Sequence, residues 1–131
     1  MEPVEFYTTF TVFPQDTNYN TPPSVFGGKV LAEMDNCAAM TARKALYETE
    51  ATDAITVNVT NVNFYIGALV GEIVHLKGTI LKVGNKSIDI QIVGHRENRK
   101  GEVNKMCDGI FRFVARKDGI PFVHGLKNDC I

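Results

Sequence analysis

The chain has 131 residues, of which 44% are hydrophobic, and a formal net charge of −1. This size predicts one domain, residues 1–131, with a single core, and the near-neutral charge argues against a dedicated nucleic-acid-binding protein. The three cysteines are odd in number and widely spaced, which favours neither a zinc site nor a disulfide framework and fits reduced thiols in a cytoplasmic compartment.

The first part of the chain predicts a strand, a long loop and one long helix. Residues 4–13 alternate and are rich in Thr, Phe, Val and Tyr, which favours a strand. Residues 14–23 are rich in Asn, Asp and Pro, and a loop of this length in a small domain is either disordered or functional. Apolar residues then recur at three- and four-residue steps from Gly27 or Gly28 to about Glu48, which predicts the helix.

Asp35 stands out in this helix because its neighbours are apolar. Met34 precedes it, and Cys37, Ala38 and Ala39 follow it. A carboxylate in such surroundings is exposed at an interface, paired, or used in chemistry. We therefore interpret the loop, the helix start and Asp35 as the functional centre.

The second part predicts four strands in close succession. Residues 54–65 alternate, but the spacing from Val59 to Val62 breaks the alternation and indicates a β-bulge. Short connections favour an antiparallel meander, and the tail from Ile120 is expected to be irregular. The later strands are predicted at 72–83, 87–97 and 105–116, with a Gly84-Asn85 hairpin and a charged loop at 98–104 between them.

This order of elements predicts an α+β fold with one long helix against a five-stranded antiparallel sheet. Because one helix cannot cover both faces of such a sheet, we expect the other face or an edge to meet another subunit. The N-terminal residues lack the basic and apolar segments of a secretory signal, and no apolar run approaches the length of a membrane span. We therefore expect a cytoplasmic protein with neither a membrane nor a nucleic acid as partner.

Short motifs follow one another along nearly the whole chain. They are Pro14-x-Asp16-Thr17-Asn18-x-Asn20, Phe26-Gly27-Gly28, Leu31, Met34-Asp35, Thr56-Val57-x-Val59, Asn63-Phe64, Val70-Gly71-Glu72-x-Val74, Lys82-Val83-Gly84-x-x-Ser87-Ile88 and Phe111-x-Phe113-Val114-Ala115. Their order and spacing resemble those of the hotdog-fold acyl-CoA thioesterases, in particular the bacterial YciA-like acyl-CoA hydrolases.

The resemblance implies a single hotdog domain, in which an antiparallel sheet wraps a long central helix. It implies a homodimer with a continuous sheet, often within a trimer of dimers, and active sites at the dimer interface. The implied reaction of lipid metabolism is hydrolysis of acyl-CoA to free acid and CoA, without a metal and without a cofactor other than the CoA of the substrate. The aspartate at the Asp35 position is the family's catalytic carboxylate.

The chain departs from the family pattern just before Phe26. Relatives usually carry a Gly-Asn or Gly-Asp pair there, and in some of them that asparagine takes part in catalysis. This chain instead has the segment Thr21-Pro22-Pro23-Ser24. Ser24 is the candidate site residue at this position.

Thioester hydrolysis requires a polarised carbonyl and an activated water. Gly27 and Gly28 offer backbone N–H groups and a positive dipole end at the helix start. Asp35, about two turns further on, would act as a general base or as a nucleophile, and the sequence leaves both roles open. Asn61 in the predicted bulge is a candidate to orient water or the carbonyl. Glu33 points about 200° away from Asp35 on a helix, so it is the weaker candidate.

For the phosphates of CoA, the sequence offers a glycine-containing turn and a nearby cation. Lys and Arg side chains suit phosphate contacts, and a flexible backbone adds N–H donors. The candidate CoA-binding residues are Gly84, Asn85, Lys86, Ser87 and Arg96.

Two other functions stay open. The altered Thr21-Pro22-Pro23-Ser24 segment favours a non-catalytic hotdog module that binds acyl-CoA or a protein partner. A dehydratase on the same fold would use a histidine with a carboxylate, but no histidine lies in the loop before the helix. His75, His95 and His124 are therefore interpreted as structural or surface residues.

Overall fold

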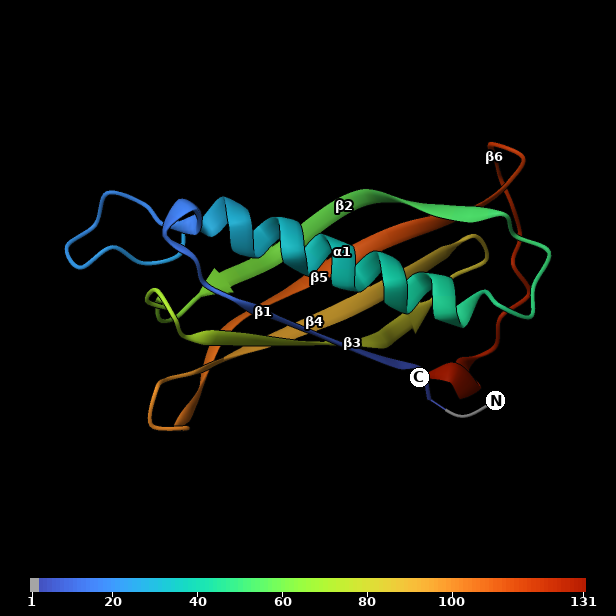
Figure 1. The fold of residues 1–131 in the computed structure, drawn as a ribbon. Helices are drawn as coiled ribbons and strands as arrows, with labels where there is room; N and C mark the ends of the chain where they lie inside the picture. Colours follow the sequence, from blue (N-terminus) through green and yellow to red (C-terminus); the bar gives the residue numbers. More distant parts are fainter. Residues whose placement is uncertain (1–2) are drawn as a thin grey trace.

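The computed structural model describes residues 3–131, which form one long helix and an antiparallel sheet (Figure 1). Within these residues, no helix combines the length and the hydrophobicity needed to cross a membrane. The elements are β1 (Glu5–Thr11), the 3-10 turn η1 (Pro14–Asp16), α1 (Gly27–Ala45), β2 (Asp53–Phe64), β3 (Ile73–Val83), β4 (Ser87–Glu97), β5 (Val103–Lys117), β6 (Ile120–Pro121) and the 3-10 turn η2 (Asn128–Cys130).

The sheet has the strand order β1-β3-β4-β5-β2, and the short β6 pairs with β5. Strands β3, β4 and β5 form the predicted meander, but the prediction is wrong for β2. That strand pairs with β5 at one edge, while β1 pairs with β3 at the other. The reason is that residues 65–72 carry the chain past the ends of β5 and β4 before β3 begins. The tail, predicted to be irregular, contributes β6 and η2.

Helix α1 lies across one face of the sheet (Figure 1). Its buried side chains recur at three- and four-residue steps, as the sequence predicts, and most of them are small. The helix ends at Ala45, earlier than the predicted Glu48, because Leu46 takes φ −92° and ψ 1°, outside the helical region. The buried residues of α1 are Val30, Met34, Cys37, Ala38, Thr41, Ala42 and Ala45.

Strand β2 carries two bulges. Its pairing with β5 gains one extra residue between Thr56 and Asn58 and another between Thr60 and Asn63. The second bulge is the one that the broken alternation predicts, and Asn61 within it has a positive φ of 51°. Bulges bend a strand and change the direction in which its side chains point.

Helix α1 lies very close to β3 at Gly78. A methyl group on Gly78 would collide with the Thr41 hydroxyl and would lie 3.2 Å from the Ile92 side chain. The Thr41 hydroxyl is buried, and it donates a hydrogen bond of 2.8 Å to the carbonyl of Cys37, one turn earlier. Its polar group is therefore satisfied within the helix, and the glycine sets how near the helix lies to the sheet.

Gly78→Ala is expected to lower the free energy of unfolding by about 1–3 kcal/mol, because an added methyl group overpacks the contact between α1 and β3. Urea unfolding followed by circular dichroism measures this change.

Thr41→Ala alone and the double variant Thr41→Ala/Gly78→Ala provide the control. Removal of the hydroxyl makes room for the methyl group, so the double variant should lose less stability than the sum of the single variants. Strictly additive losses would show that this contact does not limit the approach of the helix.

Candidate functional site

Asp35 lies in an open hollow of about 320 Å³ between α1 and β2. Its Oδ1 atom accepts a hydrogen bond of 2.7 Å from the Thr56 hydroxyl, which joins the helix to the strand. The carboxylate therefore has one fixed hydroxyl partner in mostly apolar surroundings. The remaining walls of this hollow come from Gly28, Leu31, Ala32, Val59 and Phe111.

Thr56 is a site residue that was not predicted from the sequence. It belongs to a motif of the second predicted strand, but nothing in that motif assigns it a partner. The hydrogen bond depends on how α1 is set against β2, across 21 residues of sequence. The alternation of β2 indicates only that the side chain of Thr56 faces the same side as that of Ala54.

The start of α1 contributes unpaired backbone donors next to this hollow. The N-cap residue Phe26 makes no side-chain capping hydrogen bond, and the first turn has no acidic residue. Such a helix start leaves N–H groups and the positive end of the dipole for a ligand oxygen. Gly28 lines the Asp35 hollow, and a methyl group on it would lie 2.7 Å from the Phe26 ring. Gly27 lines a neighbouring hollow.

Ser24 lies in that neighbouring hollow, which measures about 370 Å³, and not in the hollow of Asp35. Its backbone N–H donates to Asn18 Oδ1 at 3.3 Å, and its hydroxyl accepts from Asn18 Nδ2 at 3.4 Å. The same Oδ1 atom accepts a hydrogen bond of 3.0 Å from the N–H of Asn20. Asn18 thus holds the altered segment in place, a role that the sequence did not indicate.

Asn61 does not share a hollow with Asp35 within one chain. It is exposed in the second bulge of β2, and its carbonyl accepts a hydrogen bond of 3.1 Å from Asn63 Nδ2. The same amide donates to Asp108 Oδ1 at 3.2 Å, so Asn63 fixes the shape of the bulge.

The predicted CoA-binding residues lie at opposite ends of β4. The turn at 84–87 leads into its first residue, and Arg96 is its second-to-last residue, about 30 Å away at the usual rise per residue of a strand. One chain therefore does not bring these residues together in one phosphate site.

The turn at 84–87 and the Arg96 side chain both make interactions within the chain. In the turn, the Gly84 N–H donates to the Ser87 carbonyl at 2.9 Å, and that carbonyl also lies 3.0 Å from a ring nitrogen of His124. Arg96 donates to Asn104 Oδ1 at 3.0 Å and lies 4.0 Å from a carboxylate oxygen of Glu72.

Other reactive side chains lie away from Asp35 or are held in an unreactive state. Glu33 does not line the Asp35 hollow, and it pairs with Lys29 at 3.3 Å. Burial raises the pKa of the Cys37 thiol and of the Cys107 thiol to about 11, so both are protonated at neutral pH and are poor nucleophiles.

His75 lies on the face of the sheet away from α1, because it alternates in β3 with Val74 and Leu76, which are buried on the face that the helix covers. Its ring nitrogens lie 3.1 Å from the Thr9 hydroxyl and 2.9 Å from a Glu97 carboxylate oxygen. This histidine therefore belongs to a polar network on the outer face and not to the Asp35 hollow.

The comparisons with known proteins agree with one another. Residues 23–103 match the family described as the thioesterase superfamily. A relative from Haemophilus influenzae, named as an uncharacterized acyl-CoA thioester hydrolase, is 34% identical over 106 residues, covering 78% of this chain and 65% of the relative. The crystal structure of an apo-hexameric acyl-CoA thioesterase is 31% identical with a TM-score of 0.84, covering 93% of this chain and 78% of that chain.

The hexameric thioesterase from Yersinia pestis is 26% identical with a TM-score of 0.81, covering 92% of this chain and 94% of that chain. The chain thus spans just under two thirds of the length of the Haemophilus influenzae relative. The matched family region covers more than half of the chain and includes the start of α1, Asp35 and Thr56. The chain therefore belongs to the thioesterase superfamily and has the hotdog fold that its sequence predicts.

Proposed function

We propose that the protein is an acyl-CoA thioesterase that hydrolyses acyl-CoA to a free acid and CoA. The observation that carries the proposal is the Asp35 carboxylate, which is hydrogen-bonded to Thr56 beside the glycine-containing start of α1. The names of the Haemophilus influenzae relative and of the apo-hexameric structure support the same substrate class. Residues 1–131 act as one catalytic domain, with no cofactor other than the CoA of the substrate.

In the proposed reaction, the thioester carbonyl oxygen points to the N–H groups at the start of α1. These donors polarise the carbonyl and stabilise the oxyanion that develops on it, an effect worth about 2.7–4 kcal/mol per donor in other enzymes. Asp35 takes a proton from a water molecule through the carboxylate oxygen that Thr56 does not occupy, and this water attacks the carbonyl carbon. The C–S bond then breaks, and the CoA thiolate takes up the proton that Asp35 removed from the water.

A second route uses the same residues. Asp35 attacks the carbonyl carbon directly, and CoA leaves as a thiolate that takes a proton from solvent. Water then hydrolyses the resulting anhydride, which releases the free acid and restores the Asp35 carboxylate. In both routes Thr56 is a positioning residue, because its hydroxyl fixes the orientation of the carboxylate.

We further propose that the protein is a homodimer formed through β2, and that dimers associate further. β2 is a 12-residue edge strand whose Ile55, Val57 and Val59 side chains are 40%, 49% and 41% exposed. A long edge strand with exposed apolar side chains tends to pair with another surface. An antiparallel β2 from a second copy of the chain would supply hydrogen bonds to its free backbone groups and apolar contacts to its side chains. Because Val59 also lines the Asp35 hollow, the partner would complete the walls of the site. Two similar structures are described as hexameric.

Asp35→Asn is expected to lower kcat by about 10²–10⁴-fold, since it removes the base or nucleophile and keeps the shape of the side chain. Release of free thiol from a panel of acyl-CoA substrates measures the rate. Glu33→Gln removes a carboxylate from another face of the same helix and should keep nearly full activity. Undiminished hydrolysis by Asp35→Asn would exclude this carboxylate from the mechanism, and tight CoA binding by the natural protein without turnover would favour the non-catalytic binding module.

Thr56→Val replaces the hydroxyl by a methyl group of similar size. We expect kcat to fall about tenfold with little change in KM, because the lost hydrogen bond to a charged group orients the carboxylate. The exposed Thr60 of the same strand gives the control variant Thr60→Val. An unchanged kcat for Thr56→Val would show that the hydroxyl has no part in positioning Asp35.

Val57→Lys places a charge on the edge strand, so we expect the particle mass in solution and the thioesterase activity to fall together. Light scattering coupled to size-exclusion chromatography measures the mass. Tyr7→Lys, on the other edge strand β1, is the control and should keep the dimer. A Val57→Lys protein that keeps its full mass would contradict assembly through β2.

A further inference from the structure

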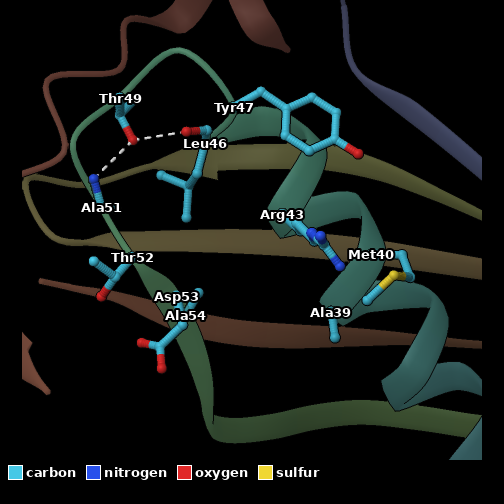
Figure 2. A pocket seen from close by; sticks show the side chains of 10 residues that line it. All are labelled: Ala39, Met40, Arg43, Leu46, Tyr47, Thr49, Ala51, Thr52, Asp53 and Ala54. Atoms are coloured by element: carbon cyan, nitrogen blue, oxygen red, sulfur yellow. Dashed lines mark hydrogen bonds between the residues drawn. The ribbon is translucent and has the colours of Figure 1, made fainter. Parts of the chain in front are cut away.

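Besides the Asp35 hollow, the structure has a second hollow between α1 and β2 (Figure 2). It measures about 450 Å³ and lies between the last turns of α1 and the start of β2. Ala39 and Arg43 lie on the same face of α1 as Asp35, one and two turns further on. Ala54 precedes Thr56 by two residues and so shares its face of the strand. The two hollows therefore lie end to end along one seam.

The walls of the second hollow are mostly apolar. Met40, Leu46, Tyr47 and Ala51 contribute to them, which suits a hydrocarbon chain. The turn at the far end is held by Thr49, whose hydroxyl donates to the Leu46 carbonyl at 2.8 Å and accepts from the Ala51 N–H at 3.3 Å (Figure 2). This end of the hollow is thus a fixed wall.

The hollow contains one basic and one acidic side chain, and only the acid is paired. Asp53 accepts two hydrogen bonds from Arg116, of 2.8 Å and 2.6 Å. Arg43 makes no ion pair with any residue that the structure describes. Figure 2 shows the Arg43 side chain beside that of Met40. Long side chains on a helix lean toward its start, which is the direction in which Asp35 lies. The second hollow thus holds an available guanidinium group.

The other end of the seam contains several polar side chains. The hollow beside Gly27 has apolar walls, but Asn18, Asn20 and Ser24 also line it, and their amides and hydroxyl suit the amide-containing arm of CoA. With CoA at that end and the thioester at Asp35, the acyl group extends into the hollow of Arg43.

We propose that Arg43 binds a carboxylate at the far end of the acyl chain, so that dicarboxylic acyl-CoA thioesters are the preferred substrates. This inference rests on the proposed function. Asp35 and Arg43 are separated by eight residues, or about 12 Å along the helix, and the arginine side chain spans part of that distance. An extended chain advances about 3.5 Å per three bonds, so the remaining gap suits an acyl group of about five or six carbons.

The test compares glutaryl-CoA with pentanoyl-CoA, whose acyl chains have the same number of carbons and differ in the terminal carboxylate. The natural protein should hydrolyse glutaryl-CoA with a kcat/KM about tenfold higher, the usual gain from a charge-assisted hydrogen bond. Arg43→Gln should lose this advantage and hydrolyse pentanoyl-CoA at nearly the natural rate.

Lys44→Gln is the matched control. It removes the same charge from the adjacent position of α1, but its ammonium group donates to the Glu5 carbonyl at 3.0 Å, on the side of β1. The preference for glutaryl-CoA should survive in this variant.

Two kinetic results would overturn the inference. An equal loss on both substrates in Arg43→Gln would place the guanidinium on the CoA part of the substrate, and a natural protein without preference for glutaryl-CoA would leave Arg43 without a role in selection. If no acyl-CoA is hydrolysed at all, the proposed function fails separately. Calorimetric binding of the two thioesters then decides the inference, which requires tighter binding of glutaryl-CoA that is lost in Arg43→Gln.

Discussion

Gly78 lies beneath Thr41 with no room for even a methyl group between α1 and β3. This contact limits the distance of the helix from the sheet, and the small residues Ala38 and Ala42 on the buried face allow the same approach. Protein interiors are packed so closely that a displacement at one contact is transmitted to the next. The hydrogen bond between Asp35 and Thr56, on the other side of the helix, depends on the same placement. The packing of α1 against the core therefore also sets the geometry of the candidate site.

The candidate site lies between the buried helix α1 and the edge strand β2, one side of which is unpaired in a single chain. Helix α1 packs against the core. Strand β2 is an edge strand that has two bulges in its pairing with β5 and several exposed apolar side chains. The hollows along this seam are open in a single chain, so water reaches them until another surface covers them. Under the proposed function, such a site would link catalysis to assembly, because the surface that completes the walls would also exclude solvent.

Much of this arrangement could be predicted from residue patterns. The periodicity of the helix, predicted from Gly27 or Gly28 to about Glu48, and the alternation of the strands indicated the elements. The apolar neighbours of Asp35 pointed to that carboxylate. The position of β2 beside β5 could not be predicted, because strand order depends on contacts between distant segments. Thr56 was missed for the same reason, since its partner is set by the packing of helix on strand. The separation of Arg96 from the turn at 84–87 follows from the length of β4, so it could have been predicted from the sequence.

The first bulge of β2 gives the hollow around Asp35 an unusual composition. Thr56 and Val59 both line it, although they are three residues apart and a regular strand places such residues on opposite faces. The extra residue between Thr56 and Asn58 shifts the alternation by one and brings both side chains to the same side. Because of this one extra residue, the Thr56 hydroxyl and the apolar Val59 side chain line the same hollow. Length changes at this point of the strand would reassign the faces of all the residues that follow, even with every other side chain unchanged.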